Sequence, residues 1–293
     1  MRTAVILMAY GSPRGPEDIP AYLTDIRGGR EASSQAVEEL RERYRRIGGS
    51  TLNDITERQR AGLERELGQP VYVGMNHWSP RIADAVESAL ADGAERIVGI
   101  VLAPHYSTIS IGGYRRLLEA AIAERAELVF VESWHDHEPF IDFVADRIRG
   151  ADAHVVFTAH SLPKRILAEG DPYRDQLLET SQLLADRAGV ESWSFAFQSE
   201  SATGEAWLGP DILDELERLQ REGVRKVLVA PVGFVSDHLE IQWDIDVEAT
   251  EKAAELGLDL DRIESPNDDP VFIRGLAALV RQVTQVPNRI EAR

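Results

Sequence analysis

The chain has 293 residues, which is enough for one large hydrophobic core or for two cores of about 100–150 residues each. Hydrophobic residues make up 43% of it, but no apolar run approaches the roughly 20 residues of a membrane span, and the formal charge of −18 disfavours nucleic acid and anionic membranes as partners. Cysteine is absent, which excludes disulfides, thiolate zinc sites and a cysteine-ligated iron–sulfur cluster.

The N-terminal segment MRTAVILMAYGSP has a basic residue followed by an apolar run, as a signal sequence does. The run is short, lacks a convincing cleavage site and leads directly into turn residues, so we interpret residues 3–10 as a buried first strand. Because no export signal is predicted, the expected location is the cytoplasm. We also expect a monomer without integral membrane association.

Short β-branched runs alternate with longer amphipathic, charged segments along the whole chain. The expected strands cover residues 3–10, 71–75, 96–103, 127–132, 154–158, 194–197 and 226–230. Between them lie helical patterns such as PRIADAVESALADG and PDILDELERLQREG. This alternation predicts α/β units built around parallel sheets.

These two helical patterns belong to an internal repeat. Residues 80–98 align without gaps on residues 210–228, with identity at Pro80/Pro210, Ile82/Ile212, Asp84/Asp214, Glu87/Glu217 and Gly93/Gly223. In each copy proline opens the helix, glycine closes it and a strand follows. We therefore predict two similar α/β domains, 1–150 and 151–293, with the last helical pattern, PVFIRGLAALVRQV, packing back onto the body.

Ligands of open α/β sheets bind beyond the carboxyl ends of the strands, and two such domains facing each other would form a cleft there. The residues at those ends are Tyr10, His77, His105, His160, Gln198 and the run after Pro231. Of the seven histidines in the chain, three lie at this edge. His160 is therefore a candidate base or metal ligand, or else a turn histidine.

Three acidic residues, Glu240, Asp244 and Glu248, are spaced four residues apart, which stacks them along one stripe of a helix. The alternation of apolar residues from Ile241 to Val247 also fits a strand, but the helical continuation favours a helix. Stacked carboxylates repel one another unless cations or protons screen them. The stripe is either a solvated helix face or a site for a loosely held divalent ion, to which His160 would add a nitrogen donor.

Motifs for several common chemistries are missing: the sequence contains no G-x-G-x-x-G, Walker, H-E-x-x-H or G-x-S-x-G segment. Eight other segments resemble, in order and spacing, those of the ferrochelatase family. They are MAYGSP, RYRRIGGSTLNDIT, LAPHYSTISIGGY, TAHSLP, GDPYRDQ, FQS, WLGPD and PVGFVSDHLE. The resemblance implies two Rossmann-like, chelatase-type domains, each a parallel sheet flanked by helices, with a porphyrin cleft between them.

The reaction implied by this resemblance is the insertion of ferrous iron into a porphyrin, with iron as a substrate and no permanently bound cofactor. The flat macrocycle must be bent so that a nitrogen lone pair points out of its plane, and two pyrrole protons must leave. His160 then corresponds to the residue facing the ring centre, as proton acceptor, metal ligand or both. Glu240 corresponds to its partner, and Asp244 and Glu248 to a path for protons or entering metal.

Tyr10, within MAYG, resembles the Gram-positive type of the family, which uses coproporphyrin III, and it could approach the metal from the face opposite His160. Coproporphyrin III has four propionates, so further basic and hydroxyl contacts are implied. Those assigned by resemblance are Tyr10, Arg27, Arg43, Tyr44, Ser50, His77 and Tyr114. Gly28 and Asn76 depart from the family pattern, where a basic residue is often found.

Three alternatives remain beside iron insertion into coproporphyrin III. One is a ferrochelatase acting on protoporphyrin IX, and another is a metal chelatase for a different tetrapyrrole, with cobalt as the metal. The third is a haem or porphyrin binder without catalytic turnover, although such a protein would gain nothing from a stripe of acids. The motifs AHSLP, GFVSDHLE and MAYG together argue against the cobalt chelatase, the His160–Glu240 pair argues against the binder, and Tyr10 favours coproporphyrin III over protoporphyrin IX.

Overall fold

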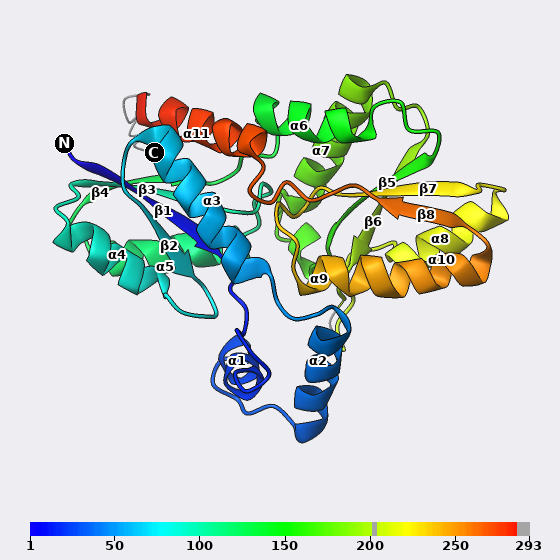
Figure 1. Cartoon of the computed structure of the whole chain (residues 1–293), viewed down its shortest axis with the longest axis horizontal. Helices are drawn as coiled ribbons and strands as arrows, with labels where there is room; N and C mark the ends of the chain where they lie inside the picture. Colours follow the sequence, from blue (N-terminus) through cyan, green and yellow to red (C-terminus); the bar gives the residue numbers. More distant parts are fainter. Residues whose placement is uncertain (201–203, 286–293) are drawn as a thin grey trace.

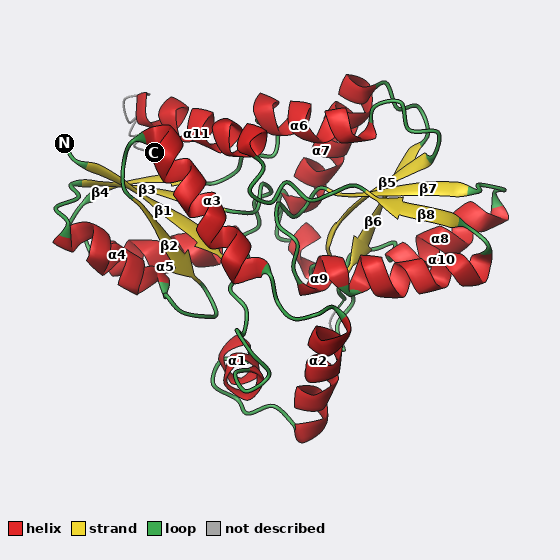
Figure 2. Cartoon of the chain, viewed as in Figure 1, coloured by secondary structure: helices red, strands yellow, loops and turns green. Residues whose placement is uncertain are grey.

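The computed structural model describes residues 1–200 and 204–285 and contains two four-stranded parallel sheets (Figures 1 and 2). The first sheet has the order β2-β1-β3-β4, with β1 (Thr3–Ala9), β2 (Val71–Met75), β3 (Arg96–Val101) and β4 (Glu127–Val131). The second has the order β6-β5-β7-β8, with β5 (His154–His160), β6 (Trp193–Gln198), β7 (Lys226–Pro231) and β8 (Asp259–Arg262). The predicted α/β class with parallel sheets is confirmed.

Helices cover both faces of each sheet, and α1 and α2 project away from the sheets as an arm (Figure 1). In the first half they are α1 (Ile19–Ile26), α2 (Ser34–Arg46), α3 (Leu52–Leu67), α4 (Ile82–Ala91), α5 (Ile111–Ile122) and α6 (Glu138–Ile148). In the second half they are η1 (Lys164–Leu167), α7 (Tyr173–Ala188), α8 (Ile212–Arg221), α9 (Leu239–Gln242), the π-helix η2 (Asp244–Ala249), α10 (Thr250–Leu256) and α11 (Pro270–Gln285). None of the described helices has the length and apolar character needed to cross a bilayer.

The two halves repeat one plan, as the sequence predicts. The first half begins with β1 and β2, after which α4 leads to β3. The second half begins with β5 and β6, after which α8 leads to β7. The same main-chain bond closes both copies: Met75 N–H donates to the Pro80 carbonyl at 2.7 Å, and Phe197 N–H donates to the Pro210 carbonyl at 2.8 Å. The repeated segment therefore occupies the same place in each half.

Side chains of β1 alternate between two cores, because successive residues of a strand point to opposite faces. Ala4, Ile6 and Met8 pack in the cluster formed with α4 and α5. Val5 and Leu7 belong to a second cluster, which includes residues of α3, α6, α7 and α11 and continues into β5. This second cluster therefore joins the two halves of the molecule.

The last helix returns to the first half, where α11 packs against α3 and α6. Phe272 anchors it, with its ring 6.3 Å from Trp134 and 5.8 Å from Phe143. The chain passes from one sheet to the other between β4 and β5, and α6, which lies between them in sequence, packs against α7. These contacts link the halves on both sides of residue 150.

Most of the predicted strands differ from the observed ones by one or two residues at an end, and two differences bear on the site or the topology. β5 continues to His160, two residues beyond the predicted end, because it still pairs with β6 at His160 and Gln198. β8 was not predicted: its sequence, DLDR, has no apolar run, and it pairs only with β7. Short, charged edge strands of this kind depend on the neighbouring strand rather than on their own apolar pattern.

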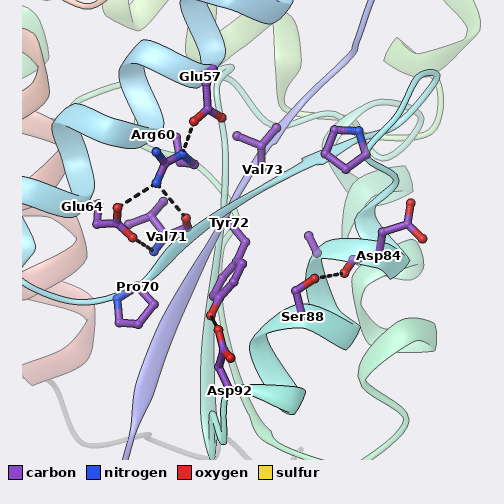
Figure 3. Close-up of a pocket in the computed structure, with 12 residues that line it drawn as sticks. Glu57, Arg60, Glu64, Pro70, Val71, Tyr72, Val73, Asp84, Ser88 and Asp92 are labelled. Carbon is purple, nitrogen blue, oxygen red and sulfur yellow. Dashed lines mark hydrogen bonds and ion pairs between the residues drawn. The ribbon is translucent and has the colours of Figure 1, made fainter.

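A cavity of about 530 Å³ lies at the outer edge of the first sheet, between α3, α4 and β2 (Figure 3). Arg60 pairs there with Glu57 and Glu64, and Glu64 accepts a hydrogen bond from the Val71 N–H. The outward backbone of β2 is thus partly occupied by side chains, which protects an edge strand from further pairing. None of the predicted site residues lines this cavity.

Gly233, just after β7, approaches β5 very closely. A Cβ atom at this position would lie 2.5 Å from Ala159 Cβ and 3.0 Å from Ala159 Cα. Gly233→Ala should therefore destabilise the fold by about 1–3 kcal/mol, seen as a lower midpoint of denaturant unfolding. Gly113→Ala in α5 is the control, since its nearest neighbour would be Arg116 Nη2 at 3.9 Å, and it should be no less stable than the parent chain.

Candidate active site

His160 and Glu240 are brought together, although 80 positions separate them in the chain. His160 is the last residue of β5 and Glu240 lies in the first turn of α9. Nδ1 of His160 is 3.2 Å from Oε2 of Glu240, and the two side chains are 29% and 34% exposed. Nε2 of His238 lies 3.6 Å from the same oxygen, so two imidazoles flank one carboxylate.

The charges of this pair are strongly coupled. Burial raises the pKa of Glu240, but the pairing with His160, followed by that with His238, outweighs it and holds the pKa well below its ordinary value. Burial lowers the pKa of His160, but the pairing with Glu240, with a smaller effect of Asp244, raises it above its ordinary value. The site therefore stabilises an imidazolium beside a carboxylate.

The acidic stripe is helical, as the sequence favours, but its second part is a π-helix. The Trp243 carbonyl accepts hydrogen bonds from Val247 N–H at 3.2 Å and from Glu248 N–H at 2.9 Å, and the second bond spans five residues. π-helical turns are rare and occur frequently at functional sites. Among residues 1–200 and 204–285, no group of three or more His, Asp or Glu side chains is placed to hold a metal ion together.

Asp244 differs from its neighbours in the stripe because it is buried, with 9% exposure. Burial, together with the charges of Glu240 and Glu248, raises its pKa to about 7, against the lowering effects of Ser199 and Arg43. The Ser199 hydroxyl donates a hydrogen bond to Oδ2 of Asp244. Asp244 can therefore exchange a proton near neutral pH. Glu248, one turn further along the stripe, is half-buried.

Tyr10 follows β1 and is 45% exposed, yet the protein around its hydroxyl raises its pKa, first by desolvation and then through the charges of Glu240 and Asp25. Its ring lies 4.6 Å from that of His77. His77 Nδ1 is 2.9 Å from Oδ2 of Asp25, and Arg81 pairs with the same carboxylate. Tyr10 is thus a neutral phenol that packs against a histidine held in place by Asp25.

Two further predicted residues, Tyr44 of α2 and Tyr114 of α5, are buried, and both phenols have raised pKa values. Desolvation is the main cause in each case, and the charge of Glu240 also contributes. The charge of Glu240 thus acts on the phenols of Tyr10, Tyr44 and Tyr114, which all belong to the first half of the chain. The two halves are therefore coupled electrostatically at this site.

The remaining predicted contacts are placed on the arm or beside it. The Arg43 guanidinium lies over the Trp243 ring, 5.3 Å from its centre, and Arg46 lies 5.1 Å from it. Ser50 donates a hydrogen bond to Ser12 at 2.6 Å. Arg27 follows the last turn of α1 and is exposed. Among the described residues, no contact of the Arg27 side chain with the His160–Glu240 pair is seen.

Three residues at the site were given no role from the sequence: Gln198 was noted only as a residue at a strand end, and Tyr173 and Trp207 were not singled out. Gln198 donates to the Glu240 carbonyl, Tyr173 donates to the His160 carbonyl, and the Trp207 ring stands edge-on to the His160 ring at 6.4 Å. All three lie in the motifs FQS, GDPYRDQ and WLGPD. The motifs indicate where these three residues lie in the sequence, but their contacts are visible only in the folded chain.

The ferrochelatase family model matches residues 2–284, which is nearly the whole chain. The chain belongs to the ferrochelatase family. A ferrochelatase of Herpetosiphon aurantiacus is 44% identical to it, over 95% of this chain and 98% of that protein. A coproporphyrin III ferrochelatase of a Geobacillus species is 40% identical, over 95% of this chain and 97% of that protein. The predicted family is confirmed, and the protein is a metal chelatase.

Solved structures show the same fold in other chelatases. SirB from Bacillus subtilis with Fe3+ superposes with a TM-score of 0.64 and 12% identity, over 97% of this ferrochelatase and 96% of SirB. CbiX, the terminal enzyme of sirohaem biosynthesis in denitrifying bacteria, gives a TM-score of 0.55 and 12% identity, over 98% and 100% of the two chains. At these identities the likeness shows the fold alone, and it confirms the predicted Rossmann-like chelatase architecture.

Proposed function

We propose that this ferrochelatase inserts ferrous iron into coproporphyrin III to give coproheme, as a step of haem biosynthesis. The observation that carries the proposal is the His160–Glu240 pair at the carboxyl end of β5, with Nδ1 and Oε2 3.2 Å apart. Relatives that carry the name coproporphyrin III ferrochelatase support the choice of porphyrin.

The pair matches what removal of the pyrrole protons requires. Because Glu240 faces Nδ1, Nε2 is the nitrogen of His160 that is left for the porphyrin. His160 accepts the two pyrrole protons in turn, passing the first on to the acidic line before it takes the second, and the Glu240 carboxylate stabilises the imidazolium that forms each time. The released nitrogen lone pair can then bind the iron. Tyr10 would approach the metal from the opposite face, through a hydroxyl that stays protonated because burial raises its pKa.

Asp244 and Glu248 continue the acidic line away from the pair, and we assign them to a path for protons or for entering metal. A carboxyl group with a pKa of about 7 can both accept and release a proton near neutrality, which suits Asp244 to such a relay. Iron is a substrate in this scheme, and no permanently bound cofactor is needed. Without cysteine, the chain has no thiolate for an iron–sulfur cluster.

The arm offers a place for substrate carboxylates. A cavity of about 410 Å³ is lined by Tyr44 and Ser50, two of the predicted contacts, and by Arg14, Arg41 and Arg45. Arg41 and Arg45 are paired there with Glu38 and Glu42, which leaves Arg14, among the described residues of this lining, as the guanidinium without such a pair. Guanidinium and hydroxyl groups bind carboxylates through charge-assisted hydrogen bonds. We assign Arg27, Arg43, Tyr44, Ser50, His77 and Tyr114, together with Tyr10, to porphyrin binding.

A competition assay tests the substrate. The purified protein is given ferrous iron without oxygen and equal amounts of coproporphyrin III and protoporphyrin IX, and the two products are separated. We expect coproheme to form at least about tenfold faster than the product of protoporphyrin IX. Coproporphyrin III has four carboxylates that can bind the basic and hydroxyl groups, whereas protoporphyrin IX has two.

A preference for protoporphyrin IX would establish the alternative substrate, which the 44% identical relative named simply ferrochelatase also allows. Parallel reactions with cobalt and a sirohydrochlorin-type substrate test the other chelatase class. Fewer than one product per protein molecule with every porphyrin would identify a binder rather than an enzyme.

A further inference from the structure

Two hydrogen bonds to main-chain carbonyls hold the segments that carry His160 and Glu240. The Tyr173 hydroxyl donates to the His160 carbonyl at 3.0 Å, and Nε2 of Gln198 donates to the Glu240 carbonyl at 2.6 Å. Tyr173 begins α7 and Gln198 ends β6, so neither donor belongs to the element that it holds. We propose that Tyr173 and Gln198 are positioning residues that set the separation and orientation of the His160–Glu240 pair, an inference that rests on the proposed function.

The His160 carbonyl needs a hydrogen-bond donor because β5 extends further than its pairing with β7. Pairing of β5 with β7 ends at Thr158 and Pro231, whereas pairing with β6 continues to His160. The Thr158 carbonyl accepts from Val232 N–H on the β7 side. Carbonyls two residues apart point to the same side of a strand, so the His160 carbonyl faces the side that β7 has left. The Tyr173 hydroxyl supplies the missing donor.

Tyr173 is itself held in place from the first half of the chain. Its side chain is buried, and its N–H donates to Oδ1 of Asp171 at 3.0 Å. The other oxygen of Asp171 accepts from the Ser107 hydroxyl at 3.0 Å and from Thr108 N–H at 2.7 Å. Ser107 and Thr108 lie between β3 and α5, so this carboxylate ties the support of His160 to the opposite half of the molecule.

Gln198 connects the strand that holds His160 to the helix that holds Glu240. Its Cα is paired with that of His160 in the ladder between β5 and β6, and the residue is 1% exposed. Only the amide nitrogen can donate to a carbonyl, so the contact with Glu240 also fixes which way the amide points. The side chain thereby sets how far the first turn of α9 lies from the end of β5.

Such supports matter because proton transfer requires the reacting groups to be held within about 0.5 Å of their productive positions. A displacement of about 1 Å can lower a rate roughly 100-fold without removing any reacting group. Neither Tyr173 nor Gln198 needs to touch the porphyrin for this effect. Their removal should therefore lower the rate of metal insertion and leave porphyrin affinity nearly unchanged.

Tyr173→Phe and Gln198→Met each remove one donor and keep the size of the side chain. In single-turnover reactions we expect each variant to insert iron about tenfold more slowly, with a porphyrin Kd within about twofold of the parent value. Tyr72→Phe is the matched control, because it removes a tyrosine hydroxyl bonded to Asp92 beside the cavity of Figure 3 and should leave the rate unchanged. Rates equal to that of the control, or a Kd that weakens in parallel with the rate, would overturn the proposal.

A second measurement does not depend on turnover. In a crystal structure of Tyr173→Phe, the separation of His160 Nδ1 and Glu240 Oε2 should exceed 3.2 Å, or the imidazole should take more than one orientation. An unchanged, singly oriented pair overturns the positioning role even if the parent protein inserts no metal at all. An inactive parent protein would instead count against the proposed function alone.

Discussion

His160→Ala is expected to lower the rate of iron insertion by about 10²–10⁴-fold, while porphyrin affinity changes by no more than about twofold. The imidazole is the group that accepts pyrrole protons in the proposed reaction, and its pairing with Glu240 at 3.2 Å fixes its position. The predicted porphyrin contacts all lie in the first half of the chain, and the substitution leaves them in place. Single-turnover kinetics and quenching of porphyrin fluorescence measure the two quantities separately.

His154→Ala is the matched control for this experiment. His154 starts the same strand and contacts Ser192 at 2.8 Å and Ser194 at 2.9 Å, at the end of β5 opposite His160. The control should keep the parent rate of insertion. If His160→Ala also inserts iron at the parent rate, His160 is not the proton acceptor, and the carboxylates would have to take that role.

The repeat and the apolar periodicity were sufficient to predict the architecture. The repeated segments around Pro80 and Pro210 correctly indicated two halves of one plan. Gly93 and Gly223 follow the ends of α4 and α8 as predicted, but the prolines do not open the helices: they precede the N-caps Arg81 and Asp211. The alternation of strands and helices likewise indicated parallel sheets. What the pattern could not reveal was β8, whose charged sequence becomes a strand only because β7 lies beside it.

The sequence assigned His160 and Glu240 to one candidate site, and the structure brings these two residues together, but the contacts that hold them could not be predicted. His160 and Glu240 stand at the end of a predicted strand and at the start of a predicted helix, positions where open sheets bind ligands. The π-helical turn at Asp244 depends on a choice between two hydrogen bonds to one carbonyl, and single-sequence periodicity does not distinguish them. The contacts of Tyr173 and Gln198 depend on where neighbouring strands stop, which is a property of the assembled sheet.

Glu240→Gln is expected to change the pH dependence of the reaction as well as its rate. Burial alone would lower the pKa of His160, and Glu240 is the main reason that this pKa stands above its ordinary value. The amide of glutamine carries no charge, so the pKa of His160 should fall in the variant, even though Asp244 still raises it slightly. The imidazole would then lose its proton at a lower pH.

The sign of the effect on rate follows from the role of His160 as proton acceptor. A protonated imidazole cannot accept a pyrrole proton, so the rate rises as the pH increases through the pKa of His160. In the parent protein this rise should lie above the ordinary histidine pKa of about 6.5, and in Glu240→Gln it should move to lower pH. Single-turnover rates measured between about pH 5 and 9 would locate this rise, the acidic limb of the pH profile, in the parent protein and in the variant.

The maximum rate of Glu240→Gln should nevertheless be lower, by about 10–100-fold, because the imidazolium formed during proton transfer no longer has its counter-charge. Asp246→Asn, in the same π-helix, is the control: this carboxylate is exposed and pairs with Arg262 at 2.6 Å, so its loss should leave the pH profile of insertion unchanged. A lower rate with no shift of the acidic limb would mean that Glu240 acts on the metal rather than on His160. An acidic limb that shifts while the maximum rate stays at the parent value would mean that Glu240 sets the protonation of His160 but does not stabilise the charge that develops on it during the reaction.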